Sequence, residues 1–314
     1  MKKIHWLHIW AVAVLSLSTP IAVQAATSCA GAELIVRNAH IVTMDEAHPI
    51  ASAMAIRDGK ILAVGQDHDA SPCAGQNTTV VDLQGKTVLP GLIDVHTHAM
   101  EWAKGILRNQ LDTTYPKVHS IADVVALVRE RVEHRGKGTW ITGAGWDDSK
   151  FTEHRYITRT DLDTVSPDNP VYLIHVSGHL AVANTAALKL AGVGVKTPDP
   201  NGGVIDRETS GAPTGILKDT AMELVEKFIP PDPSDINAKA AKLISERALA
   251  LGLTTIHDIF ISSDEIRGYQ EAYQHGWLAL RVRMSPRIGS IEDAEKLAQM
   301  GVHTGFGDDQ LKLG

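Results

Sequence analysis

The chain has 314 residues, of which 44% are hydrophobic and 21% are charged, and its formal net charge is −7. This composition is ordinary for a globular protein and provides enough apolar material for one large domain or two smaller ones. The acidic balance, without a long run of basic residues, argues against nucleic acid as a partner. A small-molecule substrate is therefore the expected partner.

The first 25 residues have the features of a secretory signal peptide. Lys2 and Lys3 give a positive start, an apolar run follows over residues 6–23, and Val23-Gln24-Ala25 has the small-residue spacing of a cleavage site. An uncleaved membrane anchor is the alternative, because the run approaches spanning length. Pro20 and the small-residue ending favour cleavage, which predicts an exported protein, periplasmic or secreted, with no stable membrane insertion afterwards.

The only two cysteines, Cys29 and Cys73, both lie early in the mature chain. In an oxidising compartment an even pair favours a disulfide, and two unconnected thiols are the alternative. Lipidation of Cys29 is less favoured, because Thr27 and Ser28 do not supply the apolar residue expected before a lipidated cysteine.

Residues 26–87 form a succession of short β-like runs separated by turn residues such as Asp58-Gly59 and Gln84-Gly85. They predict a small antiparallel β domain that leans on something larger, since such a domain is thin when alone. The expected strands are at residues 34–36, 41–43, 53–56, 61–64 and 79–82.

Residues 88–314 have a mixed α/β pattern. A buried strand is expected from about Val88 to Val95, and an amphipathic helix from Ser120 to Val132, with Ser120 and Asp123 as its capping box. Residues 138–230 are less regular and suggest an insertion. After Pro233 strands and helices alternate, which implies parallel strands with right-handed crossovers. An α/β fold of the (β/α)8 TIM-barrel type is the simplest architecture. The expected later elements are helices at 234–251, 264–274 and 290–301 and strands at 253–260 and 278–284.

His96 and His98 end the strand that begins after Pro90-Gly91. Alternate residues of a strand share a face, so both imidazoles would point into the mouth of a barrel, where neutral histidines suit zinc or a similar divalent ion. A His-x-His pair by itself is usually explained by surface histidines. The apolar strand before it favours metal ligation here.

The run from Pro90 to His98 resembles the first-strand signature of the amidohydrolase superfamily. Further segments resemble the branch called amidohydrolase family 3, or YtcJ-like proteins. They follow in the family's order at residues 140–147, 159–163, 166–171, 177–179 with Asn184, 199–203 and 213–215.

The resemblance implies a TIM-type barrel beside a β-sandwich, of which residues 26–87 would be the N-terminal part. It also implies one or two divalent metals, with zinc as the expected ion, and hydrolysis of a non-peptide C–N bond in a small amide or cyclic amide by metal-activated hydroxide. His96 and His98 match the family's first ligand pair. The catalytic groups and remaining ligands are expected beyond Gly314, so this stretch alone is expected to be inactive and unstable. Lys312 is the less favoured match to the family's bridging lysine; an ordinary strand-entry residue is the alternative.

Three further residues are candidates for substrate binding: Trp146, His179 and His257. Each has a structural alternative, namely a packed tryptophan, a hydrogen-bonded histidine and a residue that holds a loop. Hydrolysis of a lactone or another C–O bond would use the same chemistry. An exported non-catalytic binding protein, or an inactive truncated remnant, is the alternative from another class.

Overall fold

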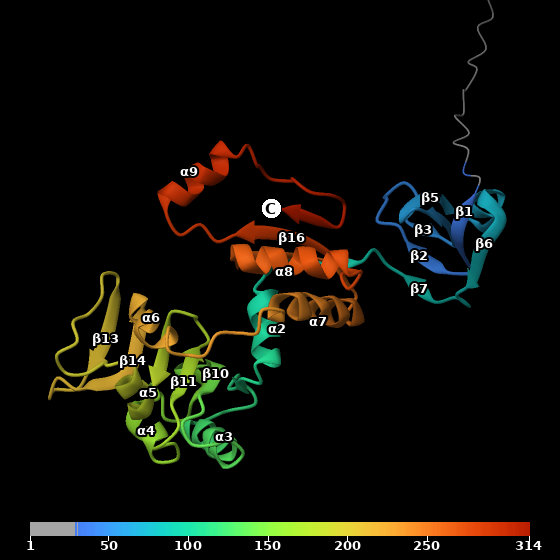
Figure 1. The fold of residues 1–314 in the computed structure, drawn as a ribbon. Helices are drawn as coiled ribbons and strands as arrows, with labels where there is room; N and C mark the ends of the chain where they lie inside the picture. The colour runs from blue at the N-terminus through green and yellow to red at the C-terminus, as the bar shows by residue number, and fades with distance from the viewer. Residues whose placement is uncertain (1–28, 30) are drawn as a thin grey trace, which may run out of the picture. The chain divides into compact units, whose positions relative to one another are not determined.

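The computed structural model describes Cys29 and residues 31–314, which divide after Pro90 into two compact units (Figure 1). The expected signal peptide lies outside the described residues. In the part that the structure describes, no helix is both long and apolar enough to cross a membrane.

The N-terminal unit contains two small β-sheets. Asp58 and Gly59 both have positive φ, at 51° and 68°, so this pair forms the hairpin turn that its sequence predicts. Two pairings are parallel, β1 with β6 and β2 with β7, so the expectation of a purely antiparallel domain was wrong. The first sheet has the order β5-β4-β1-β6 and the second β3-β2-β7, with bounds β1 Ala32–Arg37, β2 His40–Val42, β3 Ile50–Ala51, β4 Ala53–Arg57, β5 Lys60–Gly65, β6 Ala74–Asp82 and β7 Thr87–Val88.

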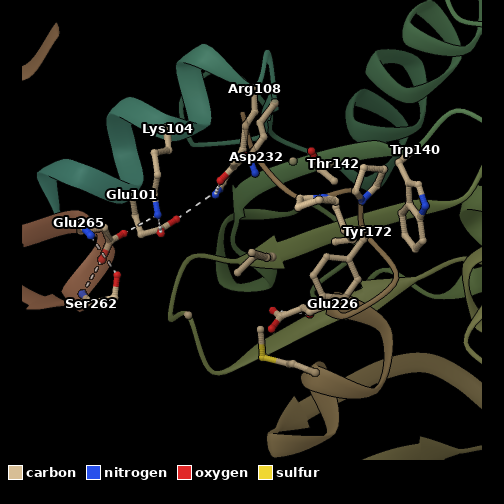
Figure 2. Close-up of a pocket in the computed structure, with 18 of the residues that line it drawn as sticks. Glu101, Lys104, Arg108, Trp140, Thr142, Tyr172, Glu226, Asp232, Ser262 and Glu265 are labelled. Atoms are coloured by element: carbon tan, nitrogen blue, oxygen red, sulfur yellow. Dashed lines mark hydrogen bonds and ion pairs between the residues drawn. The ribbon is translucent and has the colours of Figure 1, made fainter. Parts of the chain in front are cut away.

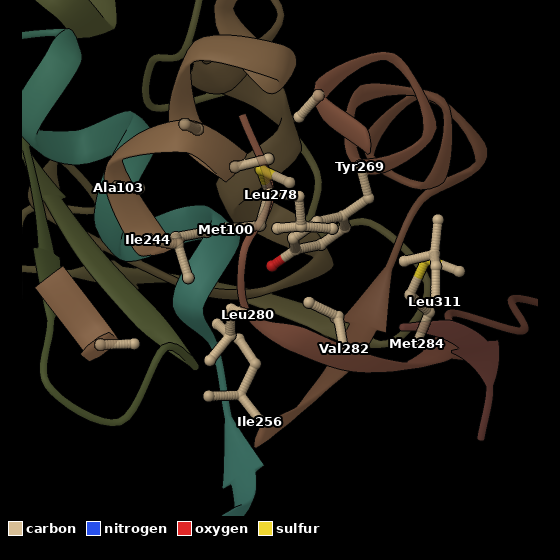
Figure 3. Packing of buried hydrophobic residues seen from close by; sticks show 14 of the residues in the cluster. Met100, Ala103, Ile244, Ile256, Tyr269, Leu278, Leu280, Val282, Met284 and Leu311 are labelled. Atoms are coloured by element: carbon tan, nitrogen blue, oxygen red, sulfur yellow. The ribbon is translucent and has the colours of Figure 1, made fainter. Parts of the chain in front are cut away.

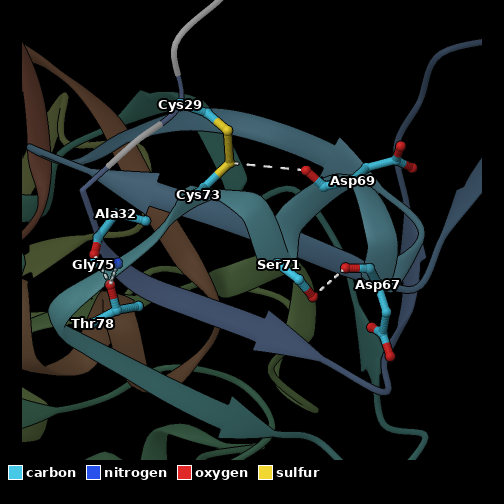
Figure 4. The surroundings of a disulfide bond; sticks show 8 residues. All are labelled: Cys29, Ala32, Asp67, Asp69, Ser71, Cys73, Gly75 and Thr78. Carbon is cyan, nitrogen blue, oxygen red and sulfur yellow. Dashed lines mark hydrogen bonds between the residues drawn. A yellow bond between two sulfur atoms is a disulfide. The ribbon is translucent and has the colours of Figure 1, made fainter.

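A disulfide joins Cys29 to Cys73 across 44 residues of sequence, with their Cα atoms 4.7 Å apart (Figure 4). Cys73 ends the short 3-10 helix Ser71–Cys73 that follows helix α1 (Asp67–Ala70), and it is completely buried. Its backbone carbonyl accepts a hydrogen bond from the Gly31 amide at 3.0 Å. The bridge therefore attaches the start of the described chain to the small core of this unit.

The C-terminal unit contains a four-stranded parallel sheet in the order β17-β16-β15-β8. Its apolar side chains pack with one face of helices α2, α7 and α8 in a single core (Figure 3). Tyr269 of α8 and Val282 of β16 are among the most buried members. The bounds are β8 Leu92–Thr97, α2 Ala99–Leu107, α7 Ile236–Ala250, β15 Leu253–Ile261, α8 Ser263–Gln274, β16 Arg281–Pro286, α9 Ile291–Gln299 and β17 Leu311–Leu313.

Strand β8 lies at an edge of this sheet and is exposed, whereas the sequence predicted a buried strand. Leu92, Ile93 and Val95 are 58%, 59% and 65% exposed. A parallel sheet is normally covered on both faces. Among the described residues, helices cover one face of this sheet, so β8 exposes apolar side chains that a closed barrel would bury.

A six-stranded mixed sheet separates β8 from β15 in the sequence. It begins at Leu111, earlier than the predicted insertion of residues 138–230, because the strand Leu111–Asp112 pairs with β10. One face packs against α3 and α4, and the other packs against α5 and α6. The order is β13-β14-β12-β11-β10-β9, with bounds β9 Leu111–Asp112, α3 Ile121–Glu133, β10 Ile141–Trp146, α4 Arg159–Asp163, β11 Val171–His175, β12 Leu180–Ala183, α5 Thr185–Leu190, β13 Gly203–Arg207, β14 Pro213–Asp219 and α6 Glu223–Glu226.

The predicted helix at 120–132 is α3, and its N-terminus shows half of the expected capping box. The Ser120 hydroxyl accepts from the Asp123 amide at 3.1 Å. In a full capping box the Asp123 carboxylate would accept from the Ser120 amide. Here it accepts from the amide of the preceding residue, His119, at 2.8 Å. The other predicted helices are present as α7, α8 and α9, each within two residues of its expected ends.

Candidate functional site

His96 and His98 lie at the carboxyl end of β8, where the strand gives way to helix α2. His96 is the penultimate strand residue and His98 is the residue that precedes α2. Both are exposed, and their ring centroids are 5.7 Å apart in an edge-to-face arrangement. The Asp94 carboxylate accepts from the His96 amide at 3.1 Å, which fixes the backbone from Asp94 to His96.

Asp258 holds the segment immediately after the histidine pair. It is completely buried on β15, and its carboxylate accepts from the amides of Ala99 at 2.8 Å and Met100 at 3.1 Å, the first two residues of α2. The Tyr269 hydroxyl donates to the same carboxylate at 2.6 Å. Burial raises the pKa of Asp258, although these three hydrogen bonds oppose the shift. Asp258 is thus a buried cap for α2, and through α2 it positions His98.

The two histidines can provide two ligands for a divalent ion, with imidazole nitrogens as donors suited to zinc. Within the described residues, they do not belong to any group of three or more His, Cys, Asp or Glu side chains close enough to hold a metal. Zinc takes three or four protein ligands, so this pair fits part of a metal site.

A separate group, Asp147, Asp148 and His175, does bring three such ligand atoms within 4.8 Å of one another. His175 Nε2 lies 3.2 Å from Asp148, while its Nδ1 accepts from the Ser177 amide at 3.1 Å. Because Nδ1 accepts from this amide, Nε2 is the ring nitrogen that can donate to Asp148. Asp147 also accepts from the Ser149 amide at 2.9 Å. These hydrogen bonds are enough to hold the three side chains together as part of a structural turn.

Trp146 lies at the end of β10, and its side chain belongs to the core. It is completely buried, and its indole Nε1 donates to the Leu173 carbonyl at 3.0 Å, so the alternative of a packed tryptophan describes it. The side chain of His179 is 80% exposed and lies 3.1 Å from Asp219. His257 is half-buried on β15, and its carbonyl accepts from Thr97 at 3.0 Å.

Lys312 lies on β17 and forms an ion pair with Asp309 at 3.4 Å. It is in register with Arg283 of β16, which is in register with His257 of β15. These three cationic or ionisable side chains share one row of the sheet. The adjacent strand residues Ile256 and Val282 point into the core formed with α7 and α8. Because successive side chains alternate between the faces of a sheet, Lys312, Arg283 and His257 lie on the opposite face.

A cavity of about 800 Å³ lies between α2, the six-stranded sheet and the carboxyl ends of β15 and β16 (Figure 2). None of His96, His98, Trp146, His179 and His257 lines it. Its volume falls within the range that small-molecule sites occupy.

Helix α2 presents a charged wall to this cavity. Lys104 is buried and forms ion pairs with Glu101 and Glu265, and these carboxylates raise the pKa of Lys104 although burial opposes its charge. Arg108 donates to both oxygens of Asp232, at 2.8 and 2.6 Å, and lowers the pKa of that carboxyl. Every charge on this wall therefore has an opposite charge beside it.

Comparison with known families identifies the family of the chain. The family model described as "Amidohydrolase family" matches residues 79–314, well over half of the chain. The chain belongs to the amidohydrolase family. This confirms the resemblance inferred from the Pro90–His98 signature and from the segments that follow it.

Several relatives share this amidohydrolase region. Protein LONG AFTER FAR-RED 3 of Arabidopsis thaliana is 40% identical over 73% of the chain and 38% of its own length. The N-substituted formamide deformylase of Arthrobacter pascens is 33% identical over 76% of the chain and 45% of its own length. A crystal structure of a metal-dependent hydrolase from Pyrococcus horikoshii OT3 has a TM-score of 0.63 at 25% identity, covering 90% of this chain and 53% of that one. The chain thus spans about half the length of these relatives, or less.

Sequence reasoning missed the cavity of this family member. Its lining comes from α2, β10, β11, α6, the segment 229–232 and the ends of β15 and β16. No local pattern marks these residues, since they come together only through the tertiary fold. The one available signal was the pair Pro230-Pro231, which follows α6 and is incompatible with a longer helix there.

Proposed function

We propose that the full-length protein is an exported, metal-dependent hydrolase that acts on a non-peptide C–N bond of a small amide or cyclic amide. Three observations support the proposal: the family membership, the relative named for deformylation of N-substituted formamides, and the solved relative named as a metal-dependent hydrolase. The observation that carries it is the placement of His96 and His98 at the carboxyl end of a parallel strand.

In this proposal His96 and His98 hold a divalent ion, with zinc as the expected metal. When bound, the ion would lower the pKa of a water molecule and polarise the carbonyl group of the substrate. The chain's own contribution is to hold the two imidazoles at the strand end. Asp94 fixes the backbone that leads into His96, and Asp258 fixes the start of the helix that follows His98.

Export forms part of the proposal. The first 25 residues have the pattern of a cleavable signal, and the Cys29–Cys73 disulfide suits an oxidising compartment. A non-catalytic exported binding protein is the second candidate.

Metal content and amide hydrolysis, measured on the full-length protein, test the proposal. Wild type should bind about one or two equivalents of zinc and release amine from N-substituted formamides or open a cyclic amide. The double variant His96→Ala/His98→Ala should lose the metal and the activity. His134→Ala, an exposed histidine after α3, is the matched control and should keep both.

The outcomes separate the candidates. If the protein binds zinc through the histidine pair but hydrolyses none of the amides, lactones or other esters tested, the result favours the binding protein. A wild-type protein that takes up no divalent metal would overturn the metal-dependent mechanism.

A further inference from the structure

Arg283 lies on the face of the four-stranded sheet that points away from helices α7 and α8. Val282 and Met284, its neighbours along β16, are almost completely buried, and Figure 3 shows both among the packed core side chains. Because side chains alternate along a strand, the side chain between them projects from the other face. Arg281, two residues earlier on β16, projects from that face as well.

A lysine and a histidine lie next to Arg283 on this face. Lys312 of β17 and His257 of β15 are its register partners on the two neighbouring strands. Register partners on adjacent strands share a face and lie about 5 Å apart. Three side chains that carry, or on protonation would carry, a positive charge are therefore side by side, and like charges at this spacing repel unless an anion lies among them.

The chain supplies little negative charge to this row. Lys312 pairs with Asp309 at 3.4 Å, but the side chain of Asp309 is 79% exposed. Asp94 of β8 is in register with Ile256, so it belongs to the opposite face. Within residues 31–314, Arg283 forms no ion pair. Its planar guanidinium therefore has its fork of donors available, and this fork matches a carboxylate through two parallel hydrogen bonds.

The row lies beside the histidine pair. The register of β15 with β8 sets His257 next to the stretch between Asp94 and Thr97, which contains His96. Arg283 is one strand further, so two strand spacings of together roughly 10 Å separate it from β8. A long arginine side chain and a small bound molecule together span this distance. A molecule whose carbonyl group lies at the histidine pair can thus present a second group to Arg283.

We propose that the substrate of the histidine site carries a carboxylate, which Arg283 binds with Lys312 as the neighbouring cation. This assignment rests on the proposed function, because it takes the histidine pair as the place where the amide carbonyl is hydrolysed. It narrows the substrate class from small amides in general to amides with a carboxylate a few bonds from the carbonyl that is attacked.

Calorimetric titration of the full-length protein at pH 7 tests the carboxylate site, after a chelator has removed any metal so that no probe is hydrolysed. The probes are N-acetylglycinate and N-acetylglycinamide, which have nearly the same shape and differ in charge. Wild type should bind the carboxylate at least about 10-fold more tightly than the amide, because only the carboxylate forms charge-assisted hydrogen bonds with the guanidinium.

Three variants locate the effect. Arg283→Gln should lose most of the preference for N-acetylglycinate and leave the affinity for the amide unchanged. Arg283→Lys keeps the charge but not the fork, so it should retain part of the preference. Arg267→Gln removes an exposed arginine from α8, which packs on the opposite face of the sheet, and this matched control should equal wild type.

Equal affinity of wild type for the two probes, no measurable binding of N-acetylglycinate, or an unchanged preference in R283Q would each overturn the proposal. Tighter binding of inorganic phosphate than of N-acetylglycinate would overturn the assignment to a carboxylate, since the guanidinium fork also fits phosphate. If R283Q does not fold, as judged by circular dichroism, Lys312→Met decides together with the wild-type comparison. K312M should weaken binding of the carboxylate several-fold and leave the amide unchanged.

Restoring zinc separates this proposal from the proposed hydrolysis. Selective binding of N-acetylglycinate with no hydrolysis of either probe or of N-substituted formamides supports the carboxylate site and counts against the hydrolase. Equal binding of the two probes, together with equal rates of hydrolysis, supports the hydrolase and removes the carboxylate site.

Discussion

Replacing Asp258 with alanine should destabilise the C-terminal unit by about 3 kcal/mol. The change leaves three buried donors without their acceptor: the Ala99 amide, the Met100 amide and the Tyr269 hydroxyl. Each unsatisfied buried donor costs about 1–3 kcal/mol, and loss of a helix cap costs about 1 kcal/mol. Part of this is offset because the variant no longer buries a carboxylate, whose raised pKa records that burial is unfavourable.

Denaturant unfolding followed by circular dichroism measures this change, and hydrogen exchange of a peptide covering Ala99–Leu107 locates it. Faster exchange in α2 is expected, because its first turn loses the cap. Tyr269→Phe should cost about 1 kcal/mol in wild type. In the D258A background it should instead restore about 1–3 kcal/mol, because it removes a buried donor that has lost its acceptor. The surface variant Asp168→Asn, which breaks an exposed ion pair with Lys137, is the control and should leave the unfolding curve almost unchanged.

Asp258 is not the cap of α2 if the unfolding free energy of D258A lies within about 0.5 kcal/mol of wild type and the hydrogen-exchange rates of α2 are unchanged. Additive effects of D258A and Y269F would refute the shared hydrogen bond specifically.

Three further predictions concern other contacts. Asp232→Asn should destabilise the protein at pH 7. Because Arg108 lowers the pKa of Asp232, the pair stabilises the fold above the usual aspartate pKa, and this stabilisation is lost as the pH falls through the lower folded value. Acid titration should therefore bring the two unfolding curves together only below the usual aspartate pKa. Cys73→Ser, which opens the 44-residue link to Cys29, should lower the stability of the N-terminal unit by up to about 4 kcal/mol in thermal unfolding, and wild type under reducing conditions should match the variant. Trp146→Ala should cost about 3–5 kcal/mol in denaturant unfolding, and a cost near zero would show that this tryptophan is not part of the core.

Local signals in the sequence predicted local structure well. The hairpin at Asp58-Gly59 requires positive φ at both positions, and the Ser120–Asp123 spacing sets the start of α3. Such features depend on a few neighbouring residues, so the sequence contains all the information that they need. The parallel pairing of β1 with β6 was missed because both strands have patterns that fit either direction.

Features that depend on distant segments were predicted poorly. The apolar pattern of β8 suggested burial, but burial also depends on a covering layer that the pattern does not describe. Trp146 lies in a glycine-rich segment that resembled a loop, yet it ends a strand and points into the core. Glu226, a glutamate on a four-residue helix, has no distinctive neighbours in the sequence, and only the fold places it beside Tyr172.

The ion pair between Arg108 and Asp232 has a consequence for the order of folding. It joins two residues 124 positions apart, one just before the six-stranded sheet and one just after it. Asp258 must find the Ala99 amide across 159 residues, and a search over that length is slow. If the six-stranded sheet forms first and this pair holds its two ends together, the effective loop shortens and the entropy cost of closing it falls by about 1 kcal/mol. We therefore expect that α2 would still reach its cap on β15 if a shorter connection between Arg108 and Asp232 replaced the six-stranded sheet.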